Sequence, residues 1–129
     1  EKCPGSKPKK KLPVKRKSML LICSSQKFLL EKRNSEGLWG GLWTFPECDP
    51  EDLEIRLAEL KLNQKQYEML PIYRHSFSHF HLDISPVKIE VEQTEIETRK
   101  KIYRWVSVKG LTKIGIPRPT ENLMKKYAF

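Results

Sequence analysis

The segment Asn34–Glu47 restricts the fold of this chain more than any other, because it holds three glycines, two tryptophans and a proline in 14 residues. Glycine permits positive φ angles and a close approach of the backbone, so the segment predicts a loop that packs aromatic side chains against main chain. Two apolar runs, Met19–Cys23 and Lys27–Arg33, precede the loop and are separated by a polar break. Such a pair of runs predicts a β-hairpin that leads into the loop.

A helix is predicted directly after the loop, over Pro50–Leu62. Asp49 is suited to the N-cap position and Pro50 to the first helical position. Leucines recur at helical spacing and predict one apolar face, at Leu53, Leu57 and Leu60.

The second half of the chain predicts strands and one more helix. The predicted elements are an extended segment at 67–77, a turn at Ser76–His79, strands at Phe80–Ile84, Val87–Val91 and Lys100–Val108, and a helix at Arg118–Tyr127. Pro86 predicts a sheet edge or a bulge, and Thr120 is a candidate N-cap of the last helix. This order of elements predicts an α/β (α+β) fold: an α/β sandwich with a mixed β-sheet and about two helices.

Basic side chains are concentrated at the start of the chain. The net charge is +9, of which residues 1–17 contribute +7 and the remaining 112 residues +2. A Pro/Lys-rich segment has too little apolar surface to fold alone, so we expect a basic interdomain linker or arm over 1–17 and a folded domain over 18–129. Such an arm attracts a polyanion, above all the phosphates of nucleic acid. The residues proposed for this contact are Lys9, Lys10 and Lys11; a solvated linker without a partner is the alternative.

The cysteines and the hydropathy pattern point to a reducing compartment. Cys3, Cys23 and Cys48 fit no C-x-x-C metal or redox motif, so we expect reduced thiols and no metal. No apolar run approaches the roughly 20 residues that span a bilayer, and no segment has the pattern of a signal peptide. These features predict a cytoplasmic protein without a membrane partner.

Gly41 and Glu47 open a pattern that resembles the Nudix hydrolase motif, G-x5-E-x7-R-E-U-x-E-E-x-G-U, in which U is a bulky aliphatic residue. In that family the glutamates hold Mg²⁺ through oxygen ligands. In this register Leu57 and Glu59 keep the required residue types, whereas four positions do not: Ile55, Arg56, Leu60 and Leu62. One carboxylate that faces an arginine is a poor Mg²⁺ site, so the sequence predicts a Nudix-like fold without diphosphate hydrolysis.

Several segments resemble the C-terminal domain of the MutY family of A/G-specific adenine DNA glycosylases. The most specific stretch is Leu29–Glu47; further matches lie at Pro4–Lys15, Arg74–Ile84, Trp105–Val106 and Gly115–Pro119. The resemblance implies a Nudix-like, MutT-related α/β/α sandwich that closes over DNA on the side opposite the catalytic domain. It also implies that a loop reaches the 8-oxoguanine paired with adenine through three residues: Phe77, Ser78 and His79.

The same resemblance assigns the chemistry to another part of the parent protein. This sequence has no helix-hairpin-helix catalytic domain, so its catalytic carboxylates and its four cluster cysteines are missing as well. We therefore expect no catalytic residue and no cofactor in this chain, and a [4Fe-4S] cluster in the catalytic domain of a parent adenine glycosylase. The expected partners are duplex DNA containing 8-oxoguanine:adenine and that catalytic domain, within a monomeric, DNA-associated protein of the bacterial cytoplasm.

Ser78 has the chemistry that reading this lesion requires. Oxidation turns guanine N7 into a donor and adds an acceptor oxygen at C8, and a hydroxyl group can both accept and donate. Without the resemblance, plainer roles remain open: Phe77 as a core anchor, Ser78 as a turn residue and His79 as a solvated residue.

Two other functions are compatible with the sequence. The first is a stand-alone hydrolase of oxidised nucleotides, against which the degenerate Nudix helix argues. The second is a non-catalytic interaction module whose basic arm docks a partner. The salt dependence of duplex binding separates this module from a DNA-binding domain, because phosphate contacts give a steep slope.

Overall fold

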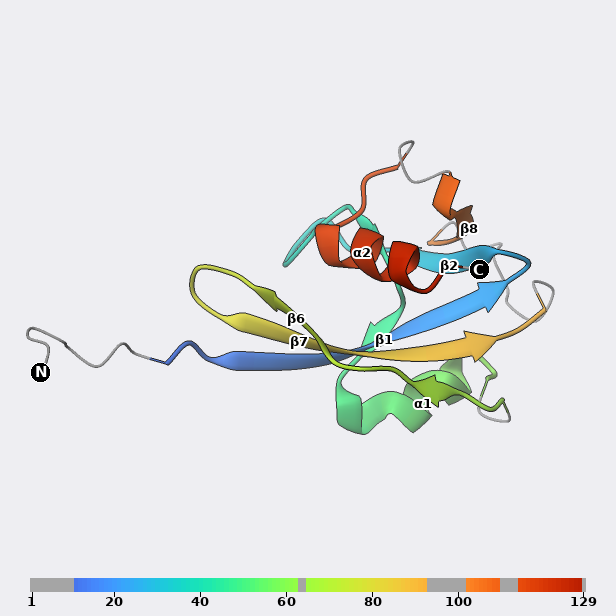
Figure 1. The fold of residues 1–129 in the computed structure, drawn as a ribbon, viewed down its shortest axis with the longest axis horizontal. Coiled ribbons are helices and arrows are strands. Elements are labelled where there is room, and N and C mark those ends of the chain that lie inside the picture. Colours follow the sequence, from blue (N-terminus) through green and yellow to red (C-terminus); the bar gives the residue numbers. More distant parts are fainter. Residues whose placement is uncertain (1–10, 63–64, 93–101, 110–113, 129) are drawn as a thin grey trace, which may run out of the picture.

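The computed structural model describes residues 11–62, 65–92, 102–109 and 114–128 (Figure 1). Within these residues, the strands join in one mixed sheet of eight. The strands are β1 (Val14–Ser24), β2 (Lys27–Lys32), β3 (Trp43–Thr44), β4 (Glu47–Cys48), β5 (Glu68–Met69), β6 (Tyr73–Ser76), β7 (His81–Glu90) and β8 (Tyr103–Ser107).

The predicted hairpin is confirmed as β1 and β2, which pair antiparallel. Ser25 and Gln26 connect them with φ angles of 49° and 66°. Two successive positive φ angles are typical of the tight turns whose twist matches that of a β-hairpin. On its other edge β2 pairs antiparallel with β8, from Lys27 opposite Ser107 to Glu31 opposite Tyr103.

The centre of the sheet is a parallel ladder between β1 and β7, which runs from Val14 opposite His81 to Cys23 opposite Glu90. The second edge of β7 pairs antiparallel with β6 and then with β5. Pro86 therefore lies in a central strand, between the residues of β7 that pair with β6 and those that pair with β5. Its carbonyl accepts a hydrogen bond from Leu70 N–H (2.9 Å), and the N–H that proline lacks is not needed at a gap in the pairing.

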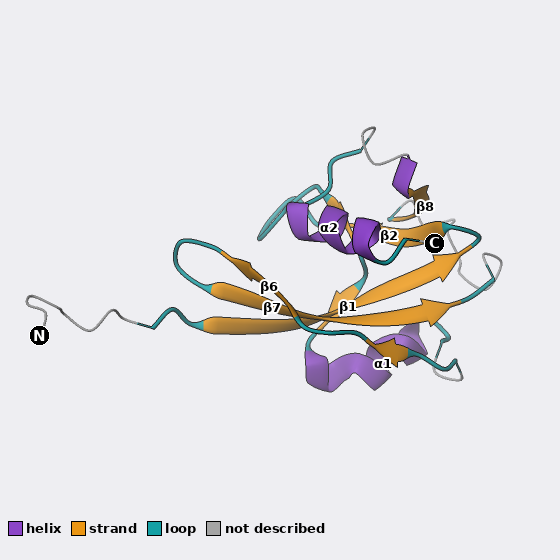
Figure 2. Ribbon diagram, in the orientation of Figure 1, coloured by secondary structure: helices purple, strands orange, loops and turns teal. Residues whose placement is uncertain are grey.

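Two helical segments cover opposite faces of the sheet (Figure 2). The first is a 3₁₀ turn, η1 (Pro50–Asp52), followed by α1 (Leu53–Glu59); the second is α2 (Arg118–Lys126). Alternate residues of β1 point to the two faces, so Met19, Leu21 and Cys23 pack with α2 residues, while Leu20 and Ile22 pack with α1 residues. The predicted sandwich with a mixed sheet and two helices is confirmed.

The helix ends differ from the sequence-based expectation in two details. Asp49 occupies the predicted N-cap position before Pro50, but its side chain makes no capping hydrogen bond and instead pairs with Lys17 (2.8 Å). The N-cap of α2 is Pro117, so the prediction of Thr120 is wrong. Thr120 is fully buried, and its hydroxyl bonds that of Thr44 at 2.5 Å, because a hydroxyl buried against the sheet needs a polar partner.

The start of the folded domain also differs from the expected residue 18. β1 begins at Val14, so Lys15, Arg16 and Lys17 belong to the sheet and not to an arm. Of the three arm lysines, Lys11 is described and exposed, whereas Lys9 and Lys10 lie outside the described residues. In the described part of the chain, no helix combines the length and the apolar character needed to cross a bilayer.

Candidate nucleic-acid interface

The predicted turn between β6 and β7 is tight, and its tip is exposed. Phe77 N–H donates to the Phe80 carbonyl (2.8 Å), which leaves Ser78 and His79 as the two residues at the tip. Both side chains are exposed, and Ser78 Oγ lies 3.3 Å from His79 Nδ1. The structure thus brings two of the three predicted contact residues to one accessible point, where the exposed His79 ring also meets the Phe80 ring edge-on with centroids 4.9 Å apart.

Phe77, the third predicted residue, faces the domain and is half-buried. Its ring stacks on Phe80 with centroids 4.5 Å apart and meets the His75 ring edge-on at 4.7 Å. It also packs against the core cluster on the α2 side of the sheet. Phe77 therefore has the environment of an anchor that fixes the turn, and the tip residues project beyond it.

Polar pairs across β6 and β7 stiffen the base of this turn. Arg74 donates two hydrogen bonds to the Asp83 carboxylate, at 2.7 and 3.0 Å, in the bidentate geometry that favours both charges. These bonds lower the pKa of Asp83 and raise the pKa of Arg74. Nearer the tip, Ser76 Oγ lies 2.7 Å from His81 Nδ1.

The basic N-terminal segment meets the sheet beside the turn. His81 N–H donates to the Pro13 carbonyl (2.9 Å), so the chain enters β1 next to the first residue of β7 (Figure 1). One step into the strand, Lys15 Nζ lies 4.5 Å from the centre of the Phe80 ring, within the range of a cation–π contact. An exposed lysine, Lys11, and an ammonium group held over an aromatic ring therefore lie at the same end of the sheet as Ser78 and His79.

The glycine-rich loop forms the other wall of this region. Trp39 projects from it toward the turn, with ring centroids 5.9 Å from Phe77 and 6.2 Å from His75. Between the loop and the sheet lies a hollow of about 320 Å³, lined by aromatic, aliphatic and charged side chains: Lys15, Lys17, Arg33, Leu38, Trp39, Glu47, Phe80 and Leu82. The sequence predicted that aromatic side chains of this loop pack against main chain, but it did not predict the contact of Trp39 with the turn, because nothing in the local pattern relates residues 39 and 77.

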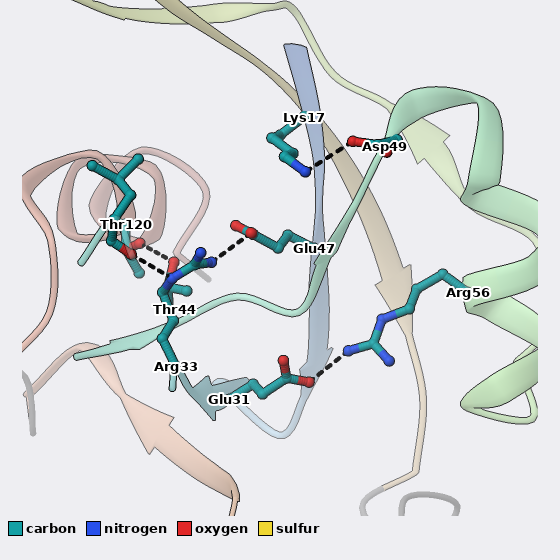
Figure 3. A network of polar contacts seen from close by, with 9 residues as sticks. Lys17, Glu31, Arg33, Thr44, Glu47, Asp49, Arg56 and Thr120 are labelled. Carbon is teal, nitrogen blue, oxygen red and sulfur yellow. Dashed lines mark hydrogen bonds and ion pairs between the residues drawn. The ribbon is translucent and has the colours of Figure 1, made fainter. Parts of the chain in front are cut away.

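A second, larger hollow of about 770 Å³ contains the residues of the degenerate Nudix pattern, among them Glu47, Ile55, Arg56 and Glu59. The Arg56 guanidinium pairs with Glu31 at 2.5 Å (Figure 3). It also pairs with Glu59 at 3.4 Å. Burial tends to lower the pKa of Arg56, but the charge of Glu31 and its hydrogen bond outweigh it, so the pKa is raised and the cation is permanent.

This groove does not fit the Mg²⁺ that the Nudix fold implies. A cation already stands between its carboxylates, and Ile55, at another motif position, is 63% exposed and offers no oxygen ligand. Within the described ranges, no three histidine, cysteine or carboxylate side chains are grouped as metal ligands. Of the cysteines, Cys23 is buried and Cys48 half-buried, both as free thiols whose pKa values are raised by burial.

A mixed sheet between two helical layers, with a G-x5-E loop that leads into a helix lacking the metal ligands, defines a Nudix-type domain without the hydrolase site. The chain belongs to the NUDIX domain family, whose model matches residues 18–126.

Adenine DNA glycosylases are among the relatives of the chain. The adenine DNA glycosylase of Buchnera aphidicola from Acyrthosiphon pisum is 33% identical over 131 residues, which cover 98% of this chain and 37% of the relative. The chain spans about a third of the length of the adenine DNA glycosylases that it matches.

Solved structures share the fold. The C-terminal domain of mouse MUTYH, in its complex with human PCNA, superposes with a TM-score of 0.66 at 17% identity and covers 87% of this chain and 86% of that one. A mutT/nudix family protein from Listeria innocua gives a TM-score of 0.74 at 12% identity, over 90% of this chain and 92% of that one.

Proposed function

We propose that this chain is the lesion-recognition domain of an adenine DNA glycosylase, which binds duplex DNA and reads 8-oxoguanine opposite adenine. The observation that carries this proposal is the exposed Ser78–His79 tip of the anchored turn, beside which the basic N-terminal segment enters the sheet. The similarity to adenine DNA glycosylases over 98% of the chain supports it as well.

Ser78 supplies the discrimination in this proposal. Its hydroxyl accepts from N7–H of 8-oxoguanine or donates to O8. Normal guanine has no O8, so a hydroxyl oriented to donate to O8 would lose its hydrogen bond there, at a cost of about 1–3 kcal/mol. Phe77 holds the turn in position, and His79 contacts the neighbouring backbone or base.

The remaining parts of the repair reaction lie outside this chain. Hydrolysis of the glycosidic bond, its catalytic carboxylates and a [4Fe-4S] cluster belong to the catalytic domain of the parent glycosylase, which is also the partner of this domain. The lysines at the start of the chain, Lys9, Lys10 and Lys11, bind DNA phosphates without regard to sequence. The protein works as a monomer on DNA in the bacterial cytoplasm.

The experiment that tests this function is Ser78→Ala in the intact glycosylase. Binding is measured for two duplexes, one with 8-oxoguanine opposite a non-hydrolysable adenine nucleotide and one with guanine in place of the lesion. The ratio of the two binding constants should fall roughly 5- to 30-fold, because one hydrogen bond worth about 1–2 kcal/mol is lost. The melting temperature should stay unchanged, since Ser78 is exposed. An unchanged ratio at unchanged stability would remove Ser78 from the recognition site and overturn the proposal that this turn reads 8-oxoguanine.

A further inference from the structure

Glu47, the first glutamate of the degenerate Nudix pattern, is engaged in an ion pair within the domain. Its carboxylate lies 2.5 Å from Arg33 Nη1, and the side chains of Glu47 and Arg33 are only 18% and 23% exposed. Figure 3 shows the two side chains pointing toward each other, separate from the Arg56–Glu31 pair on the α1 side. A partly buried pair with this short contact holds its geometry better than a surface pair does.

Arg33 also bonds the middle of the glycine-rich loop, through its side chain and its backbone. Its Nε donates to the Leu38 carbonyl at 2.8 Å. Its backbone N–H donates to the Leu42 carbonyl (2.9 Å), and its carbonyl accepts from Gly41 N–H (3.3 Å). One guanidinium therefore bridges Glu47 and the middle of the loop, and the planar fork of arginine is suited to hold two acceptors at once.

The loop that Arg33 holds presents Trp39 to the lesion-reading turn. Trp39 follows Leu38 directly and has a φ of 57°, in the left-handed region that a bulky side chain adopts only when its surroundings require it. Gly40 passes so close to the loop start that a Cβ there would lie 2.3 Å from the Ser35 carbonyl oxygen. The loop is thus held tightly, and its indole ring rests against Phe77 and His75.

We infer that the Glu47–Arg33 pair is a positioning device for lesion recognition: it holds the Trp39 loop, and Trp39 holds the turn that carries Ser78 and His79. This inference rests on the function proposed above. In a Nudix hydrolase the glutamate at this position would bind a metal. In this chain Glu47 positions the Trp39 loop and, through it, the turn that carries Ser78 and His79. Glu47, Arg33 and Trp39 are positioning residues, since they act through Phe77 and not on the base.

Glu47→Gln tests the inference, because it removes the charge and keeps the shape. The matched control is Glu31→Gln, which breaks the other carboxylate–arginine pair of the same groove, at Arg56 and not at Arg33. The chain is labelled with 5-fluorotryptophan, and the ¹⁹F resonance of Trp39 is assigned with the Trp39→Phe variant. The chemical shift of this resonance should change in Glu47→Gln and stay unchanged in Glu31→Gln. In the intact glycosylase, the ratio of affinities for lesion and normal duplexes should fall about 3- to 10-fold in Glu47→Gln only.

The outcomes separate the two proposals. A Trp39 resonance that stays in Glu47→Gln, or moves equally in Glu31→Gln, overturns the positioning role. An unchanged affinity ratio in Glu47→Gln, when Ser78→Ala lowers it, also overturns that role and leaves the proposed function standing. If Ser78→Ala leaves the ratio unchanged too, the proposed function fails, and the role in recognition fails with it. Should Glu47→Gln unfold, Arg33→Lys, which keeps the charge but loses the planar fork, takes its place with the same expected results.

Discussion

Phe77 and Ser78 are neighbours in the chain with different physical tasks. The Phe77 ring lies among Phe80, His75 and Trp39, whereas the Ser78 hydroxyl is exposed at the tip of the turn. A half-buried aromatic residue contributes to the free energy of unfolding through packing, and an exposed serine contributes almost nothing. Substitutions at the two positions should therefore separate stability from recognition.

Phe77→Ala is predicted to lower both stability and affinity for DNA. The loss in the free energy of unfolding should be about 2 kcal/mol, below the roughly 3–5 kcal/mol of a fully buried phenylalanine, because Phe77 is half-buried. Denaturant unfolding measures the change. His79→Ala is the control: its side chain is exposed, so its stability should stay within about 0.5 kcal/mol of the wild type. Equal stability of the two variants would contradict the anchoring role of Phe77.

At the scale of elements, the residues just before β1 and the turn between β6 and β7 lie at one end of the sheet. The Pro13–His81 hydrogen bond joins the start of β1 to the start of β7, and Lys11 is exposed just before it. Phosphate contacts by the arm and base contacts by the turn should therefore fall on one stretch of duplex, and they should respond differently to salt.

Neutralising Lys9, Lys10 and Lys11 to glutamine is predicted to weaken binding to lesion and normal duplexes alike. The slope of log affinity against log salt concentration should become shallower by about 2–3, because each phosphate contact contributes about 0.9. A control triple at exposed lysines of other elements, Lys61, Lys125 and Lys126, should leave the slope unchanged. If the lesion-to-normal ratio changed at a constant slope, the arm would be reading bases.

The elements that sequence patterns predicted well are those specified by neighbours in the chain. The hairpin over β1 and β2, the helix after Asp49 and the turn before His81 all have local signals, and all are present. The parallel pairing of β1 with β7, the burial of Thr120 against Thr44 and the contact of Trp39 with Phe77 join distant segments. Such contacts are set by the packing of the whole sheet, so a single sequence carries no signal for them.

At the scale of the whole molecule, the Nudix fold is present and its metal site is replaced by an ion-pair network. Arg56 lies between Glu31 and Glu59, where it neutralises carboxylates that would otherwise attract a cation. A bound divalent ion would have to displace a guanidinium that is mostly shielded from water.

The chain is therefore predicted to have no Mg²⁺-dependent pyrophosphatase activity. Incubation with 8-oxo-dGTP and Mg²⁺ should release no more product than a blank without protein, while an active Nudix hydrolase serves as the positive control. Millimolar Mg²⁺ should also leave the melting temperature unchanged, because a ligand stabilises a protein only where it binds the folded state. Turnover clearly above the blank, or a rise in melting temperature that a chelator reverses, would show that the groove holds a metal.

The parallel ladder between β1 and β7 has a consequence for how the domain folds. β1 is the first of the described strands to be synthesised, and residues 25–80 separate it from β7 in the sequence. Contacts between such distant segments require closure of a long loop and slow the folding of a domain. During synthesis, the apolar half of β1, which includes Leu20, Leu21 and Ile22, has β2 and β4 to pair with among the described strands, but its edge toward β7 stays open until β7 has left the ribosome. The nascent domain thus exposes an unpaired strand edge for much of its synthesis, and that interval is when aggregation or chaperone binding competes with the native sheet.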